Sequence, residues 1–444
     1  MRDSNWTYTA SFRVPPELLA HTRHQLYFGS IDTAATITLN GVELGQVANA
    51  HRPHAFDVLE LLVPGEQNLS VAIAPATAWS EQQAQAYPYS VPRTQQEGAY
   101  GAYNFIRKGG AYNSCYFMRT WQPENKPTFL GLRSAAAASD FGWDWGPSFA
   151  PAGIGGSLEL RSYSTAFLNG LNVQQLHLDN GSVLVTVGAE LELGAGSTQR
   201  GLLEATISGG GAQPWSAQQA VTLSPASTAS DGSAADSASG GDCIAAPAGA
   251  TPSSVLCSLV VQVDPPFQLW WPYEFGAQPL YTLNVSFSPD SKAPDVSSGS
   301  SISDGSSSSS DGSGGSNGSG GSSSLSRRIG LRTVELVTDP LPGGGESFYF
   351  RVNGLPVYAR GANVVPPDIL PTGPRSTDAA LRQLVASATA ANMNFLRVWG
   401  GGRYLADAFY DACDEAGVLV WQEAMFACAL YPANRAFLEE VSRR

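Results

Sequence analysis

Charged side chains, cysteines and long apolar runs are all scarce in this chain of 444 residues. Charged residues make up 14%, and the net charge of −13 argues against nucleic acid, which is bound by clustered Lys and Arg. Five cysteines without C-x-x-C spacing argue against zinc, and their odd number predicts no disulfide framework. No run approaches the eighteen apolar residues of a membrane-spanning helix. We therefore expect a neutral or weakly charged ligand, with no metal, organic cofactor, nucleic acid or membrane as partner.

Glycine and proline are abundant, with 47 and 29 residues, which indicates many turns. Residues 1–163 read as short strands, and "TITLNGVEL" (Thr36–Leu44) is the clearest case. Its Asn40-Gly41 pair supplies the positive φ angles of a two-residue hairpin turn. This part of the chain is predicted to form a jelly-roll β-sandwich.

A second all-β block covers residues 164–290, with a size and strand spacing typical of one immunoglobulin-like sandwich. Its stretch 225–254 is rich in Ala, Ser and Gly, and residues 291–326 are dominated by Ser and Gly. Such segments bury too little apolar surface to offset their chain entropy, so both are predicted to be disordered. Residues 327–346 should complete the sandwich and link it to the next domain.

Residues 347–444 alternate strands and helices. The apolar periodicity predicts helices over Thr377–Ala391 and Tyr404–Ala416, and strands at Asn394–Trp399 and Val418–Ala424. About three βα units are present, against the eight of a closed barrel of roughly 250 residues. The fold class is therefore multidomain β plus α/β, with the last part forming an open parallel sheet or the first part of a (β/α)8 barrel.

Ligands collect at the carboxyl ends of parallel strands. Arg397 and Trp399 alternate in "RVWGGG" and point to one side, while the glycines permit a tight turn or a close approach to a ligand. Arg397 could equally form an ion pair with a neighbouring strand, and Trp399 could be a packed core aromatic. Asp368 and Glu423 are candidates for the two facing carboxyl groups of a glycosidase, or for solvated charges at loop and strand ends.

The segment "FGWDWGP" places two tryptophans around one aspartate. A sugar ring packs its C–H face on an indole, while its hydroxyl groups bond to a carboxylate. Trp143, Asp144 and Trp145 could supply both contacts, provided that the neighbouring glycines let the backbone twist. The alternative is a buried aromatic plug between two domains.

Together, several segments resemble the β-mannosidases of glycoside hydrolase family 2. They are "GSIDTAATITLNGVELG", "FGWDWGP", "FYFRVNGLPVYARGAN", "ANMNFLRVWGGG" and "FYDACDEAGVLVWQEAMFACALYP". The resemblance runs from about Trp6 to the end, apart from the low-complexity inserts and one other segment. It implies a jelly-roll domain, an immunoglobulin-like sandwich and a catalytic barrel.

The resemblance also assigns roles to single residues. It implies that Trp143, Asp144 and Trp145 reach from the first domain to the terminal mannose of the substrate. Arg397 and Trp399 would shape the subsite that holds this sugar. The activity implied is that of an exo-acting retaining β-mannosidase, which hydrolyses terminal β-D-mannose from oligosaccharides or glycoproteins without a cofactor.

The sequence departs from the family's pattern in several places. The family's acid/base glutamate lies in a W-x-G-N-N-E motif and its nucleophile follows later; neither motif occurs here, so no catalytic residue is assigned. Residues 109–140 read as an insertion before "FGWDWGP", and Val364 stands where an aromatic residue is usual. Glu423 replaces an aspartate of the family and does not match its acid/base position, so the resemblance argues against Glu423 as a catalytic residue.

Two further expectations follow. This chain could instead be a catalytically inactive carbohydrate-binding fragment, or its family specificity could be for galactose or glucuronic acid. The family works mostly in lysosomes, vacuoles or outside the cell, so these compartments are favoured over the cytoplasm. N-x-S/T triplets, which are acceptors for N-glycosylation, are consistent with this. They lie at Asn5, Asn68, Asn180, Asn284 and Asn317.

Overall fold

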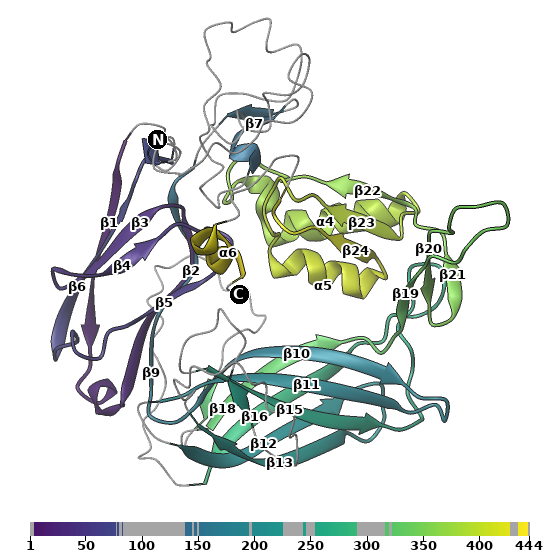
Figure 1. The fold of residues 1–444 in the computed structure, drawn as a ribbon, viewed down its shortest axis with the longest axis horizontal. Coiled ribbons are helices and arrows are strands. Elements are labelled where there is room, and N and C mark those ends of the chain that lie inside the picture. The colour runs from purple at the N-terminus through teal and green to yellow at the C-terminus, as the bar shows by residue number, and fades with distance from the viewer. Residues whose placement is uncertain are drawn as a thin grey trace, which may run out of the picture.

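A computed structural model describes most of the strands and helices of the chain (Figure 1). The described residues are 4–76, 78–79, 82, 138–143, 146–148, 151–194, 198–224, 243–245, 254–290, 316–318, 322–426 and 434–442. Only the backbone is described at 138, 141–143, 146–148, 245 and 316–318. The predicted insertion at residues 109–140 therefore lies outside the described residues, apart from its last three.

The first sandwich packs a four-stranded sheet, in the order β1-β6-β3-β4, against a three-stranded sheet, in the order β5-β2-β9. Alternate side chains of each strand fill the core; in β6 these are Leu69, Val71 and Ile73. Asn40 and Gly41 have φ angles of 51° and 83°, which confirms the predicted hairpin turn between β3 and β4. The elements are β1 (Trp6–Val14), η1 (Leu18–Ala20), β2 (Arg23–Asp32), β3 (Ala35–Leu39), β4 (Val42–Val47), β5 (His54–Asp57), β6 (Gly65–Ile73) and β9 (Gly153–Tyr163).

The second sandwich packs sheet β10-β11-β15-β14 against sheet β13-β12-β16-β18-β17. β11 shows why it forms: its alternate residues Val183, Val185, Val187 and Ala189 are fully buried between the two sheets. The strands are β10 (Phe167–His177), β11 (Val183–Glu192), β12 (Gln199–Ser208), β13 (Trp215–Leu223), β14 (Ile244–Ala245), β15 (Ser254–Val263), β16 (Tyr281–Pro289), β17 (Ser316–Gly318) and β18 (Ser322–Ile329).

Two predictions of disorder are wrong at their edges. β14 lies inside the stretch 225–254, and β18 begins at Ser322, inside the stretch 291–326. The reason is that β18 is a paired strand of the sandwich: Ser323 is 1% exposed, and its hydroxyl accepts a hydrogen bond from the Leu168 amide at 2.9 Å. Serine-rich composition conceals a strand whose polar side chains are satisfied inside the fold.

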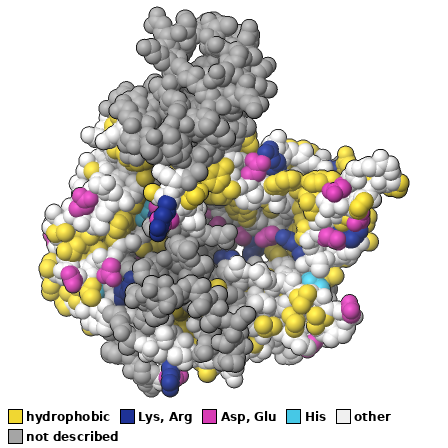
Figure 2. Space-filling model, viewed as in Figure 1, with side chains coloured by type: hydrophobic (Ala, Val, Ile, Leu, Met, Phe, Trp, Pro, Cys, Tyr) yellow, Lys and Arg dark blue, Asp and Glu magenta, His cyan; other side chains and the backbone are white. Residues whose placement is uncertain are grey.

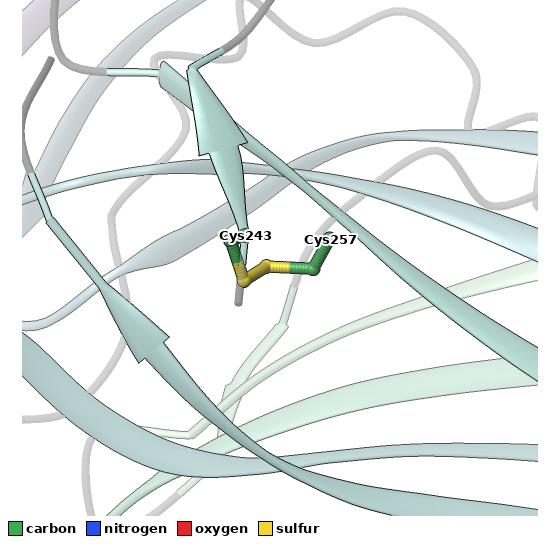
Figure 3. The surroundings of a disulfide bond; sticks show 2 residues. All are labelled: Cys243 and Cys257. Atoms are coloured by element: carbon green, nitrogen blue, oxygen red, sulfur yellow. A yellow bond between two sulfur atoms is a disulfide. The ribbon is translucent and has the colours of Figure 1, made fainter. Parts of the chain in front are cut away.

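The odd number of cysteines predicts no disulfide framework, yet the structure contains a disulfide. Cys243 and Cys257 are bonded across the antiparallel pair β14–β15, where neighbouring Ile244 lies opposite Leu256 (Figure 3). The bond closes a loop of 14 residues in sequence separation. Cys413 is a free, buried cysteine, and burial raises its pKa to about 12, so its thiol is unreactive at neutral pH.

The disulfide should stabilise the second sandwich. Closing a loop of this length restricts the unfolded chain, so we expect Cys243→Ala to lower the free energy of unfolding by about 2–3 kcal/mol. Urea unfolding with and without dithiothreitol measures this. Dithiothreitol should lower the free energy of unfolding of the wild type to that of the variant and should not change that of the variant. An unfolding free energy of the wild type that does not change with dithiothreitol would contradict the prediction.

The α/β segment holds the parallel sheet β22-β23-β24 and, before it, the antiparallel sheet β19-β20-β21. Helices α4 and α5 cover one face of the parallel sheet, and both were predicted. The Thr377 hydroxyl caps α4 by accepting from the Ala380 amide at 3.3 Å, and Gly417 ends α5 with a φ of 76°. The elements are β19 (Val334–Val337), β20 (Tyr349–Val352), β21 (Leu355–Val357), β22 (Gly361–Val364), η4 (Pro374–Ser376), α4 (Asp378–Ala390), β23 (Phe395–Val398), α5 (Asp407–Ala416), β24 (Leu419–Gln422) and α6 (Arg435–Ser442).

Charged side chains line the seam between the α/β segment and the second sandwich (Figure 2). Arg328 of β18 pairs with Asp411 and, at 2.7 Å, with Glu415 of α5. Glu415 also pairs with Arg382 of α4 at 2.9 Å.

The fold is mostly sheet and multidomain, as predicted. None of the helices among the described residues is long and apolar enough to cross a membrane.

Candidate carbohydrate site

The candidate site is built on the carboxyl ends of three parallel strands. In the register of the sheet, Asn363 lies opposite Arg397, and Arg397 lies opposite Trp421. The intervening residues Leu396 and Val398 of β23 are buried against α4 and α5. Since side chains alternate along a strand, Asn363, Arg397 and Trp421 share the face that the helices leave free.

Arg397 is held from two neighbouring strands. Its Nη1 donates to Asn363 Oδ1 at 2.8 Å, its Nε donates to Glu423 Oε1 at 3.0 Å, and its Nη2 donates to the same carboxylate oxygen. The other oxygen of Glu423 accepts from the Gly400 amide at 2.7 Å. The ion pair named above as an alternative for Arg397 is therefore present. The side chain stays 36% exposed, so its remaining donor capacity faces solvent.

Trp399 begins the turn after β23, and the three glycines that follow let this turn fold tightly. The Trp399 amide donates to the Val364 carbonyl at 3.0 Å, which holds the turn against the end of β22. A Cβ at Gly401 would lie 2.1 Å from the Trp399 ring, and one at Gly402 would lie 2.7 Å from Pro366. Trp399 is half-buried, so it is not a core aromatic. Its indole rests on Gly401.

The two carboxylates proposed as a glycosidase pair serve different parts of the structure. Asp368 accepts hydrogen bonds from the amides of Leu370 and Arg375 at 3.3 and 3.2 Å, and these bonds hold its pKa below the usual value. Glu423 is engaged by Arg397 and Gly400. Among the described residues the two share no hydrogen-bond partner. Asp368 orders its own loop and Glu423 orients Arg397, so neither has the setting of a paired acid and nucleophile.

The W-D-W segment lies partly outside the described residues. Trp143 ends strand β7 (Phe141–Trp143), which pairs with β8 (Gly146–Ser148), and the backbone alone is described there. Asp144 and Trp145 fall outside the described residues. The strand β7 follows the short helix η3 (Ala138–Asp140). Figure 1 shows β7 beside the α/β segment.

A cleft of about 590 Å³ separates the first sandwich from the α/β segment. Asp32 and His51 line it from the sandwich, and Arg403 and Tyr404 line it from the loop after β23. The rings of His51 and Tyr404 meet edge to face, with centroids 5.8 Å apart. Sequence reasoning missed this contact because its residues are more than 300 positions apart and belong to no common motif.

A buried ionic cluster sits at the same boundary. Arg403 Nη2 donates to Asp140 Oδ2 at 2.6 Å, and Asp140 is 8% exposed. Burial raises the pKa of Asp140 to about 7, against an opposing effect of Arg403 and a reinforcing effect of Asp32. Burial raises the pKa of Asp32 as well. A carboxyl group whose pKa is higher folded than unfolded makes the fold less stable as pH rises between the two values.

Asp140→Asn should remove that pH dependence. Below about pH 4 the carboxyl group is neutral in both states, so variant and wild type should be similar. Between about pH 4 and 7 the variant should become more stable than the wild type by a few kcal/mol, because the unfolded wild type ionises this carboxyl group while the folded wild type keeps it protonated. Urea unfolding from pH 4 to 8 measures the difference. Asp368→Asn is the control: its lowered pKa predicts a variant that is less stable at neutral pH, with the difference vanishing in acid.

Within the described residues, no three His, Cys, Asp or Glu side chains gather closely enough to hold a metal ion. The site at the carboxyl ends of the parallel strands offers a guanidinium, an amide, a carboxylate and an indole. These belong to Arg397, Asn363, Glu423 and Trp399. These groups bind hydroxyl groups and the apolar face of a ring, which is the recognition chemistry of a carbohydrate.

Comparisons with known proteins agree with this chemistry. Residues 1–156 match the family described as "Glycosyl hydrolase 2 galactose-binding domain-like". A β-mannosidase of Rattus norvegicus is 29% identical over 99% of this chain, and β-mannosidase A of Aspergillus terreus is 30% identical over 99%. The crystal structure of a β-D-mannosidase from Dictyoglomus thermophilum superposes with a TM-score of 0.71 at 28% identity, over 99% of this chain and 43% of that one. The chain is a relative of the β-mannosidases of glycoside hydrolase family 2.

The likeness in fold extends to more distant structures. An exo-chitosanase of Amycolatopsis orientalis matches with a TM-score of 0.53 at 16% identity, which shows a shared fold and no more. The present chain spans 41% of the length of the rat and Aspergillus relatives. The predicted resemblance to the β-mannosidases is confirmed, while the roles of the W-D-W residues, Arg397 and Trp399 remain predictions.

Proposed function

We propose that this chain supplies the sugar-binding side of an exo-acting retaining β-mannosidase. The observation that carries the proposal is the arrangement of Arg397, Asn363, Trp399 and Glu423 at the carboxyl ends of three parallel strands, in a relative of the β-mannosidases. The substrate would be a terminal β-D-mannose of an oligosaccharide or glycoprotein.

In this account each group has a physical role. Arg397, fixed by Asn363 and Glu423, donates charge-assisted hydrogen bonds to the hydroxyl groups of the mannose. Trp399 presents an indole face to the ring carbons. Trp143, Asp144 and Trp145 would add contacts to the mannose, as the resemblance to the family implies. When several elements hold the sugar at once, less entropy is lost on going from the bound substrate to the transition state.

The retaining reaction itself needs two carboxyl groups about 5–5.5 Å apart, one as nucleophile and one as acid and base. We assign neither role to a residue of this chain. Asp368 is bonded to its own loop, and Glu423 is occupied by Arg397. We also propose that β22, β23 and β24 are the first strands of a (β/α)8 barrel, since their parallel order and helix placement fit that architecture.

Hydrolysis of an aryl β-mannoside tests the proposal. The complete protein that carries this chain should release the phenol from p-nitrophenyl β-D-mannopyranoside, and release it much more slowly from the β-galactoside and β-glucuronide. A verified complete protein with no activity on the mannoside, or with a preference for another sugar, would overturn the assignment.

A second candidate is carbohydrate binding without hydrolysis. It is favoured by the engagement of Glu423, which leaves the described site with binding groups and no free pair of carboxylates. This function predicts that the chain alone binds a β-mannoside and leaves it intact, whereas a hydrolase within these residues would consume it.

We also propose that the protein passes through an oxidising compartment, as lysosomal, vacuolar and secreted proteins do. The support is the Cys243–Cys257 disulfide, since cytosolic proteins are kept reduced, together with the exposure of Asn68, Asn180 and Asn284, which begin N-x-S/T triplets. Expression in a eukaryotic secretory host followed by glycosidase treatment tests this. A single unglycosylated, reduced species would contradict it.

A further inference from the structure

The base of the W-D-W hairpin is joined directly to the turn that carries Trp399. Asp140 ends η3 and immediately precedes Phe141, the first residue of β7. The Ser139 amide donates to the Gly401 carbonyl at 2.9 Å, and Arg403 Nη2 donates to Asp140 Oδ2 at 2.6 Å. Ser139 and Asp140, which precede β7, are thus bonded to Gly401 and Arg403 of the glycine turn.

The contact is shielded from solvent. The side chains of Arg403 and Asp140 are 18% and 8% exposed. Asp32 of β2 approaches from the first sandwich: its carboxylate interacts electrostatically with Asp140 and Arg403 and accepts a hydrogen bond from the Thr33 hydroxyl. Arg403 Nη1 is buried and has no hydrogen-bond partner among the residues that the structure describes. Two acids and one base are therefore held together at a boundary between domains.

Such a buried cluster of charges contributes little net stability to the fold. Removing ions from water costs about as much as their attraction returns, and here one guanidinium faces two carboxyl groups. The raised pKa of Asp140 shows that burial outweighs the attraction of Arg403. Buried ionic groups that do not stabilise a fold can instead select one geometry among several.

That geometry matters because of what the two joined segments carry. One leads within one residue into the hairpin that bears Trp143, and the other follows Trp399 by four positions. A different contact between the first sandwich and the C-terminal part, the pair Arg52–Glu440 at 2.7 Å, involves helix α6 and neither of these segments. If Trp143 and Trp399 contact one sugar ring from two domains, their spacing must be fixed, because displacements of about 1 Å can cost a hundredfold in such sites.

We propose that Arg403 is a positioning residue, which ties Asp140 and Asp32 of the first domain to the glycine turn and so sets the gap between the W-D-W hairpin and Trp399. The proposal rests on the proposed function, because the gap matters only if both segments bind the same mannose. Arg403 acts through these neighbours and is not itself a sugar ligand.

Two independent readouts test the proposal on the full chain. Hydrogen exchange of peptides covering residues 138–148 reports the docking of the hairpin, and titration with methyl β-D-mannopyranoside reports affinity. Arg403→Met should speed exchange in this peptide at least tenfold and weaken mannoside binding about tenfold. Arg403→Lys, which keeps the charge and can still bond to Asp140, should recover part of both losses. Arg52→Met is the matched control, since it breaks the pair with α6 and should change neither readout at the hairpin.

The outcomes separate the two claims. Faster exchange with unchanged mannoside affinity overturns the positioning role, as does unchanged exchange in a folded Arg403→Met protein. If that variant does not fold, Asp140→Leu removes the same contact from the other side and must give the same pair of effects. If Arg403→Met frees the hairpin but the wild type binds no mannoside, the proposed function fails while the structural link stands.

Discussion

Trp270→Ala should lower the free energy of unfolding by about 3–5 kcal/mol, which is the cost of removing a buried tryptophan. The side chain is fully buried and packs with Val352, Val357 and Leu419 where the second sandwich meets the α/β segment. Its Nε1 donates to the Asp414 carbonyl at 2.7 Å, at the end of α5. The truncation would open a cavity and leave that carbonyl unpaired, so the α/β segment should loosen from the sandwich.

Urea unfolding followed by circular dichroism measures this loss, and two variants bracket it. Trp270→Phe keeps most of the packing but loses the donor, so it should cost about 1–2 kcal/mol. Trp6→Ala, at a residue that is 41% exposed, should cost less than about 1 kcal/mol. Equal losses for Trp270→Ala and Trp6→Ala would show that the two domains are not joined through this residue.

Arg397→Met should weaken the binding of a β-mannoside roughly 10- to 100-fold, because charge-assisted hydrogen bonds contribute about 1.5–3 kcal/mol each. The substitution removes the donors that face the site. It also removes the guanidinium that bonds to Glu423 and to Asn363, while Glu423 keeps its hydrogen bond from the Gly400 amide. Methionine keeps much of the length and volume of the aliphatic stem, so the strand should remain folded.

Arg360→Met is the matched control for Arg397→Met. Arg360 forms an ion pair with Glu274 in which both side chains are exposed, at 39% and 45%, just before β22. Calorimetric titration of both variants should show lost affinity for Arg397→Met alone. If the two variants bind the mannoside equally well, Arg397 is a structural residue and the site has been assigned to the wrong face of the sheet.

Local patterns in the sequence predict much of the fold. Helix α4 was predicted over Thr377–Ala391 and spans Asp378–Ala390, because its apolar residues repeat every turn and Thr377 caps it. The Asn40-Gly41 turn is equally local, since these residues accept positive φ angles that most others avoid. The position of Arg397 on its strand allows two interpretations, and an ion pair with a neighbouring strand is one of them.

Contacts across domains could not be predicted in this way. The Asp140–Arg403 pair joins residues 263 positions apart, and nothing in either local sequence announces the other. The disulfide depends on Cys243 lying opposite Cys257, which needs the register of β14 on β15. A serine-rich stretch hid strand β18 for a similar reason: burial of its polar groups depends on partners such as the Leu168 amide. The composition of a segment does not predict which residues it pairs with in the fold.

The central claim is that these residues bind a terminal β-mannose, and calorimetric titration of the chain with p-nitrophenyl β-D-mannopyranoside tests it most directly. We predict a dissociation constant of about 1 mM, which corresponds to roughly −4 kcal/mol, with no heat for the β-galactoside and no release of nitrophenolate. Equal binding of the two glycosides, or no binding of the mannoside, would contradict the account. Released nitrophenolate would show that a catalytic pair lies among residues to which we assign none.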